Sequence, residues 1–267
     1  MTDELVALTR NPLKEKLGRG ELASCMIIRM SHGIAIGAAA ANAGLDACYI
    51  DLEHSPLSLE TTAVLCCAAR AAGVVPLVRV PGLDEALVGR LLDGGAMGII
   101  VPQIACAEQA RQAVAAARYP PEGRRSFSST QPLLNYRAFP PAQAQAAMNR
   151  SVFVAVMIES ADAVSQIDAI AAVPGLDMLF LGAGDLSADL GIPGELSHPS
   201  MRAAYARIQR AADNNGKAVG LGGLSSDPAL LAECLSAGAR FVSIGTDLAL
   251  MTRAIQEQVR RLPTVDC

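Results

Sequence analysis

Polar side chains with catalytic potential follow two apolar runs in the first third of the chain. The segment YIDLEHSP brings Asp51, Glu53 and His54 together, and the segment PLVRVP places Arg79 after another apolar run. A carboxylate beside an imidazole can fix its tautomer and raise its basicity. A guanidinium can grip a carboxylate or enolate oxygen. The alternatives are a capped loop with a surface histidine, and a solvent-facing arginine paired with a neighbouring acid.

Two more carboxylates stand at corresponding places in the second half. Glu159 directly follows the apolar run VAVMI, and Asp185 lies in LFLGAGDLSADLG, just past two glycines. Two carboxylates, together with waters and a chelating substrate, form a site for a hard cation, with Mg²⁺ or Mn²⁺ as the natural occupant. Alternatively, Glu159 is an acid favoured by a helix dipole and Asp185 is an N-cap. Their joint placement favours the cation site.

The glycine-rich stretch between these carboxylates is a candidate anion site. As a turn at a strand end, Gly182, Ala183 and Gly184 would expose backbone N–H groups that can hold a substrate carboxylate. Neither a dinucleotide nor a phosphate-loop motif is present, and there is no GxSxG. No lysine ends a predicted strand, and Lys217 starts one. A metal-stabilised enolate is therefore favoured over an imine.

The elements that position these residues are short apolar runs that alternate with alanine-rich helical stretches. The predicted strands are Ala23–Arg29, Ala47–Asp51, Val75–Val80, Gly98–Val101, Val152–Ile158, Met178–Leu181, Ala218–Leu221 and Phe241–Ile244. The predicted helices are Ile34–Ala43, Leu59–Ala71, Asp84–Asp93, Glu108–Arg118, Ala161–Ala171, Pro199–Asn214, Pro228–Ala237 and Asp247–Arg261. Eight such units predict a single (β/α)8 barrel over residues 1–267, with chemistry at the carboxyl ends of the strands.

Two features do not fit this mouth directly. The long segment Tyr119–Arg150 is interpreted as an extended loop between the fourth strand and its helix, with a short helix near Pro141–Met148, so that Arg124 and Arg125 could line the mouth. Asp93 ends a helix and is expected at the opposite end of the barrel, where the sequence alone gives it no catalytic role.

Composition limits the class of protein. Of 267 residues, 51% are hydrophobic but only 3% aromatic, which suits aliphatic packing around a buried parallel sheet. A net charge of -4 without a basic block argues against nucleic acid or an anionic membrane as a partner. Seven cysteines without a CxxC pair indicate reduced thiols. With no signal peptide and no membrane span, a cytoplasmic protein is expected.

The chain resembles the HpcH/HpaI aldolases, the metal-dependent class II pyruvate aldolases. The motifs YIDLEHSP, PLVRVP, LLDGGAMGIIVPQI, ARYPPEGRRS, IES and LGAGDLSADLG carry the resemblance in this order and spacing. It implies a TIM barrel of the phosphoenolpyruvate/pyruvate type, usually a homohexamer with its last helix exchanged between partners. It also implies that Glu159 and Asp185 bind the metal, with Mg²⁺ or Mn²⁺ first and Co²⁺ or Zn²⁺ as further candidates.

The resemblance implies a role for each remaining residue. Arg79 would contact the 2-oxo acid and stabilise enolate charge, and His54 would do acid–base chemistry, oriented by Asp51 and by Asp93. The equivalent of Asp93 lies near the site in the family, supplied by a neighbouring subunit. Glu53 would support metal-bound water, and the backbone of residues 182–184 (Gly182, Ala183 and Gly184) would hold the pyruvate carboxylate.

Three functions stay open at this point. The first is cleavage or formation of a 4-hydroxy-2-oxo acid, with pyruvate and an aldehyde as partners. The second is a citrate-synthase-like condensation of oxaloacetate with acetyl-CoA in siderophore biosynthesis. Departures from the family motivate it: Ala183 replaces a usual proline, and Met157 stands where many members have glutamine. The third is a metabolite-binding barrel without catalysis, which the complete residue set disfavours.

Overall fold

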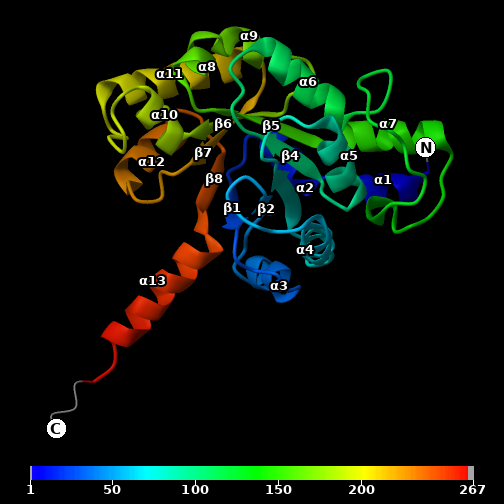
Figure 1. The fold of residues 1–267 in the computed structure, drawn as a ribbon, viewed down its shortest axis with the longest axis horizontal. Helices are drawn as coiled ribbons and strands as arrows, with labels where there is room; N and C mark the ends of the chain where they lie inside the picture. Colours follow the sequence, from blue (N-terminus) through cyan, green and yellow to red (C-terminus); the bar gives the residue numbers. More distant parts are fainter. Residues whose placement is uncertain (1, 264–267) are drawn as a thin grey trace.

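Eight parallel strands close into a barrel in the order in which they occur in the chain (Figure 1). The computed structural model describes residues 2–263. Strand bounds are β1 Ala23–Ile28, β2 Ala47–Asp51, β3 Val75–Arg79, β4 Gly98–Val101, β5 Phe153–Ile158, β6 Met178–Gly182, β7 Ala218–Gly222 and β8 Phe241–Thr246. All neighbouring strands pair in parallel, including β8 with β1. The predicted (β/α)8 barrel is confirmed.

Alternate residues of each strand separate two apolar cores. Aliphatic side chains facing outward pack under the helices, whereas the interior holds aromatic rings. Phe180 lies between Tyr49 and Phe241, with ring centroids 6.1 and 5.8 Å away. A Cβ on Gly220 would stand 2.4 Å from the Phe180 ring, so a glycine is needed there. The small residue compensates for the large ring within one closed layer.

The helices lie outside the barrel. Those that follow strands β1 to β4 are α3 Ala35–Asn42, α4 Leu59–Ala71, α5 Glu85–Asp93 and α6 Ala107–Ala117. Those that follow β5 to β8 are α8 Ala161–Ser165 with α9 Ile167–Ala171, α10 Ala183–Asp189 with α11 Pro199–Asn214, α12 Pro228–Ser236, and α13 Asp247–Arg260. The predicted single helix over Ala161–Ala171 is wrong, because the helix is interrupted at Gln166.

Several elements were not predicted, and one loop was placed at the wrong end. Helices α1 Asp3–Thr9 and α2 Pro12–Gly18 and the short 3₁₀ helix Pro132–Leu134 carry no strand partner of their own. The segment from residue 118 to α7 (Pro141–Ser151) comes after α6 and before β5. It therefore connects a helix to the next strand, at the amino end of the barrel, and does not line the mouth. Arg125 pairs with Asp93 at that amino end, and Arg124 pairs with Glu85 on the outside of the barrel, so neither lines the mouth.

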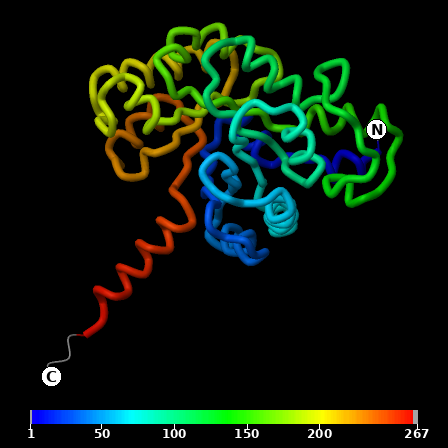
Figure 2. Tube along the Cα trace, in the orientation of Figure 1, coloured from blue at the N-terminus to red at the C-terminus, as the bar shows by residue number. Residues whose placement is uncertain are grey.

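Helix α13 leaves the barrel after β8 and extends away from it (Figures 1 and 2). Of its residues only Asp247 is buried. Exposed apolar side chains recur along the helix at Leu248, Met251, Ile255 and Val259, which is the spacing of one helix face. Within residues 2–263, no helix is both long and apolar enough to cross a membrane.

Candidate active site

Two predicted residues meet at the ends of adjacent strands. Asp51 ends β2 and is paired in register with Arg79, which ends β3. The Arg79 guanidinium donates from Nε to Asp51 Oδ1 at 2.8 Å and from Nη2 to Asp51 Oδ2 at 2.6 Å. Arg29, just past β1, donates from Nε to Oδ2 at 2.5 Å. Asp51 is fully buried and Arg79 is 4% exposed, so this ion pair is a fixed part of the mouth.

Electrostatics keeps both partners charged. Burial alone would raise the pKa of Asp51, but the hydrogen bonds and charges of Arg79 and Arg29 hold it below its ordinary value. The third nitrogen of the Arg79 fork, Nη1, lies 3.1 Å from Glu53 Oε2 and 3.8 Å from Met157 Sδ. Because Asp51 occupies the other two nitrogens, Nη1 is the one directed at the remaining groups of the mouth.

The loop after β2 turns around the same carboxylate. Asp51 Oδ1 accepts the main-chain N–H groups of Glu53 at 3.1 Å and His54 at 3.3 Å. The His54 imidazole is about half exposed, and its Nε2 lies 3.7 Å from Glu53 Oε2. Asp51 therefore orients His54 through the backbone, and the carboxylate nearest the imidazole is Glu53. The structure assigns the carboxylate–imidazole contact to Glu53, one residue before the histidine.

Glu159 and Asp185 both line an open cavity at the mouth. Glu159 follows β5 and is 8% exposed, and its Oε1 accepts the main-chain N–H of Gln103 at 2.6 Å. Burial raises the pKa of Glu159, assisted by the negative charges of Asp185 and Glu53. Asp185 lies in α10, one strand–helix unit later. The cavity measures about 1080 Å³ including its open entrance, and is lined by Glu53, His54, Gln103, Glu159, Ser160, Asp185, Ala188 and Asp189.

The arrangement fits a divalent cation. Glu159 Oε2 is buried and has no hydrogen-bond partner, which is costly for an isolated carboxylate oxygen. A Cβ on Gly182 would lie 2.7 Å from Oε2, so the glycine keeps that space open. Within residues 2–263, no three His, Cys, Asp or Glu side chains form a complete ligand set. The protein would therefore supply two carboxylates and leave the other positions to water and substrate.

The glycine-rich stretch was predicted to be a free turn. It is instead the start of a helix. Gly182 is the N-cap of α10, and Ala183, Gly184 and Asp185 are its first residues. Asp185 is therefore inside the helix and is not its N-cap. The first N–H groups of a helix have no partner within it, so backbone donors are still presented at this strand end, in a helical geometry.

Asp93 lies outside this group in the chain that carries it. It ends α5, before β4, at the amino end of the barrel, as its place in the sequence indicated. Its Oδ1 accepts a hydrogen bond from Arg125 Nη2 at 2.6 Å, and the same nitrogen donates to Gln131 Oε1 at 3.1 Å. A role for Asp93 in the acid–base chemistry therefore requires a second copy of the chain, and stays a prediction.

Sequence reasoning missed two residues at the mouth. Arg29 had a usable signal, because it ends an apolar run in the same way as Arg79. Gln103 had no such signal. Its contacts at the mouth depend on a backbone φ of 58°, which no sequence pattern around it predicts.

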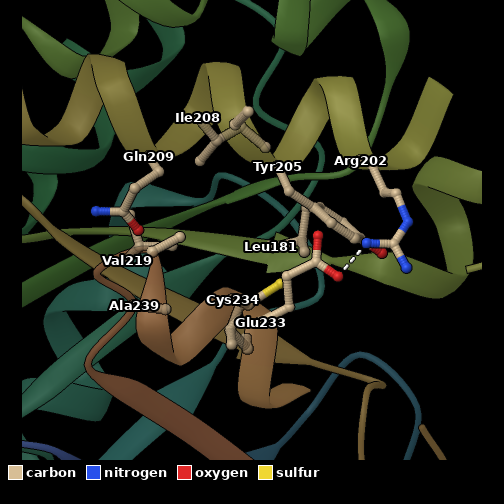
Figure 3. A pocket seen from close by; sticks show the side chains of 12 residues that line it. Leu181, Arg202, Tyr205, Ile208, Gln209, Val219, Glu233, Cys234 and Ala239 are labelled. Atoms are coloured by element: carbon tan, nitrogen blue, oxygen red, sulfur yellow. Dashed lines mark hydrogen bonds and ion pairs between the residues drawn. The ribbon is translucent and has the colours of Figure 1, made fainter. Parts of the chain in front are cut away.

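A second, more enclosed cavity lies elsewhere, between α11 and α12 over the outer faces of β6 and β7. Figure 3 shows its aliphatic floor, which includes Leu181 and Val219, and the ion pair of Arg202 with Glu233 across its rim. Its volume is about 500 Å³ including the space at its entrance. None of the predicted catalytic residues lines it, so the open cavity at the mouth is the candidate active site.

Comparisons with known proteins show the family of the chain. Residues 30–254 match the family model described as HpcH/HpaI aldolase/citrate lyase. The chain is 40% identical over 250 residues to the 4-hydroxy-4-methyl-2-oxoglutarate aldolase of Hapsidospora irregularis, covering 92% of this chain and 93% of that one.

Solved structures give the same result. An HpcH/HpaI aldolase from Desulfitobacterium hafniense superposes with a TM-score of 0.87 at 33% identity, covering 96% of this chain and 99% of that one. The citrate synthase SbnG superposes with a TM-score of 0.83 at 30% identity, covering 93% and 96%. The chain belongs to the HpcH/HpaI aldolase/citrate lyase family.

Proposed function

We propose that this protein is a divalent-metal-dependent aldolase that cleaves or forms 4-hydroxy-2-oxo acids, with pyruvate and an aldehyde or ketone as the partners. The observation that carries the proposal is the unpartnered, buried Oε2 of Glu159 beside Asp185, at the same mouth as Arg79 and His54. The aldolase names of the relatives support the same carbon–carbon lyase chemistry.

Glu159 and Asp185 would hold the cation, with Mg²⁺ or Mn²⁺ as the first candidates and Co²⁺ or Zn²⁺ next. When bound, the cation supplies Lewis-acid stabilisation of negative charge on the 2-oxo acid. Arg79 Nη1 would contact the same charge, since Asp51 holds the guanidinium in one orientation. The backbone N–H groups of Gly182, Ala183 and Gly184 would bind the substrate carboxylate, and Glu53 would orient water at the cation.

In the cleavage direction, His54 would take the proton of the C4 hydroxyl, directly or through water. The C3–C4 bond then breaks, its electron pair passes to C3 and the 2-oxo group as an enolate, and C4 leaves as a carbonyl. Protonation at C3 completes pyruvate. Asp51 contributes by fixing the main chain of His54, and Asp93 of a neighbouring copy would complete the orientation of the imidazole.

The relative from Hapsidospora irregularis points to a first substrate. Its name specifies 4-hydroxy-4-methyl-2-oxoglutarate, and the reaction above would convert that six-carbon acid into two molecules of pyruvate. We propose this compound, and 4-hydroxy-2-oxo acids with a charged C4 substituent, as the class to test.

The test is pyruvate release, coupled to lactate dehydrogenase, from a panel of 4-hydroxy-2-oxo acids with Mn²⁺, Mg²⁺ or EDTA. We expect release that needs a metal and stops with EDTA. The His54→Ala variant should lose retro-aldol turnover, and unchanged turnover would remove the histidine from the mechanism. Metal binding without release across the panel would contradict the aldolase proposal.

The second candidate is condensation of oxaloacetate with acetyl-CoA, favoured by the superposition with the citrate synthase SbnG at 30% identity. It uses the same enolate-stabilising residues with a different pair of substrates. Thiol release from acetyl-CoA in the presence of oxaloacetate would support it, and silence at every metal concentration would remove it.

We propose a homohexamer in which α13 is exchanged between copies. The exposed apolar face of α13, which includes Met251, Ile255 and Val259, supports burial against another copy, because such a stripe is unusual on an isolated helix. Ile255→Glu should convert the assembly to monomers in light-scattering chromatography.

A cytoplasmic location is supported by the free thiols of the cysteines within residues 2–263. Cys267 lies outside the described residues.

A further inference from the structure

The loop after β4 carries a residue to which none of the roles above is assigned, Gln103. Its φ of 58° lies in the left-handed region, which a side chain with a Cβ rarely adopts and which persists where the surroundings enforce it. Gln103 lines the mouth cavity between Glu53 and Glu159. Contacts from both its main chain and its side chain accompany this conformation.

The main-chain contact fixes one oxygen of the carboxylate proposed to bind the cation. The Gln103 N–H donates to Glu159 Oε1 at 2.6 Å, whereas Glu159 Oε2 has no partner. The left-handed conformation places the main-chain N–H of Gln103 at Glu159, the carboxylate that follows β5. Glu159 is thereby held with one oxygen occupied and the other available.

The side-chain contact reaches the other half of the mouth. Gln103 Nε2 donates to Glu53 Oε1 at 3.3 Å. The second oxygen of Glu53 lies 3.1 Å from Arg79 Nη1 and 3.7 Å from His54 Nε2. Through one carboxylate, the amide therefore influences the position of both the guanidinium and the imidazole.

We infer that Gln103 is a positioning residue that joins the two halves of the mouth: its backbone orients Glu159 for the cation, and its amide orients Glu53 beside Arg79 and His54. The catalytic consequence rests on the proposed function. The two contacts separate experimentally, because one depends on the backbone conformation and the other on the amide.

Two variants that both lack the side-chain amide test the backbone contact. Gln103→Ala keeps the main-chain N–H that Glu159 Oε1 accepts, whereas Gln103→Pro removes it and fixes φ at about −65°. We expect the Ala variant to bind Mn²⁺ with wild-type affinity and the Pro variant to bind about tenfold more weakly, as for other groups that orient metal ligands. Calorimetric titration with Mn²⁺ measures this without turnover. Equal affinities of the two variants would overturn the backbone part.

Gln103→Met tests the side-chain amide. Methionine has a side chain of similar length and the same energetic cost at a positive φ, but it cannot donate a hydrogen bond. We expect unchanged Mn²⁺ affinity, with about tenfold weaker binding of oxalate to the Mn²⁺-loaded protein and a comparable fall in kcat for pyruvate release. Oxalate is the probe because it is planar and doubly charged, like a pyruvate enolate. Unchanged oxalate affinity would overturn the amide part.

Asn135 provides the matched control. It also has a positive φ, 50°, but lies in the connection before α7 at the amino end of the barrel. Asn135→Ala and Asn135→Pro should leave both titrations unchanged. If the wild type binds Mn²⁺ and oxalate but releases no pyruvate, the proposed function fails, and the titrations still decide both parts of the inference.

Discussion

The two ends of the barrel each contain a buried arginine that pairs with an aspartate at 2.6 Å, yet they differ in what surrounds the pair. At the amino end, Arg125 bonds Asp93 and Gln131 and lies over the Tyr119 ring, 4.6 Å from its centroid. Gln131 in turn donates to the Tyr119 hydroxyl at 3.1 Å. This network links groups from three parts of the connection before β5.

At the mouth, Arg79 and Asp51 share two hydrogen bonds. Each end also holds a buried side-chain atom without a hydrogen-bond partner: a donor at the amino end, Arg125 Nε, and a carboxylate oxygen at the mouth, Oε2 of Glu159. Two further carboxylates, Asp185 and Glu53, raise its pKa in addition to burial. Selection for stability alone would not gather like charges around such an oxygen. The like charges around the unpartnered oxygen of Glu159 therefore support the proposed cation site at the mouth.

The largest effect should come from neutralising that oxygen. Glu159→Gln removes one of two proposed metal ligands, and we expect metal-dependent pyruvate release to fall at least about a thousandfold, the order seen when a principal electrostatic group is lost. The coupled lactate dehydrogenase assay measures this at saturating Mn²⁺. Retention of more than a tenth of the activity would show that Glu159 does not hold the cation.

Exchanging arginine for lysine at both ends is the next test. Arg79→Lys keeps the charge but loses the fork that bonds Asp51, and should lower kcat/KM about a hundredfold. Arg125→Lys should leave kcat/KM nearly unchanged and lower the free energy of unfolding by about 1–3 kcal/mol. Steady-state kinetics and urea unfolding of both variants distinguish the ends, and similar kinetic losses would contradict the contrast.

A smaller kinetic effect is expected from Asp93, the residue that could join the two ends through a neighbouring copy. Asp93→Asn should lower kcat about tenfold while Mn²⁺ affinity stays the same, because only the orientation of His54 would change. The control is Gln131→Ala, which disturbs the same network without carrying a charge. If both variants keep full kcat in the intact assembly, Asp93 belongs to the amino-end network alone.

Sequence patterns predicted the fold closely, because the ends of the buried strands and of their helices are clearly marked in the sequence. The bounds of β2, β4, α4 and α11 agree to the residue, and the family resemblance and aldolase class are confirmed by the comparisons. The prediction that Asp51 and Arg79 each end a strand also placed them correctly at the same end of the barrel. Neither the register nor the bidentate geometry could be predicted, since both depend on the closed sheet.

The errors have a physical pattern too. The long connection before β5 was assigned to the mouth because long functional loops usually follow strands, although the helix preceding it, Ala107–Ala117, puts it at the amino end. The start of α10 at Ala183 was mistaken for a turn, since two glycines are poor helix formers. Gln103 escaped notice because left-handed glutamine is enforced by tertiary contacts.

The smallest effect is on stability, and it has a pH signature. The folded pKa of Glu159 lies above its ordinary 4.5, chiefly because of burial. The stability contributed by the protonated form is therefore fully present below pH 4.5 and is lost as pH rises through the folded pKa. At neutral pH without metal, Glu159→Gln should thus be more stable than the wild type by about 1 kcal/mol, or roughly 2–4 °C in Tm.

This gain should disappear in acid and should be reversed by Mn²⁺, which binds the folded wild type and raises its Tm but leaves the variant unchanged. Thermal unfolding with EDTA and with Mn²⁺, at neutral pH and near pH 4.5, measures all four combinations. A variant that is less stable than the wild type in EDTA at neutral pH would show that the unpartnered oxygen carries no strain. The contrast between the two ends of the barrel would then have to rest on kinetics alone.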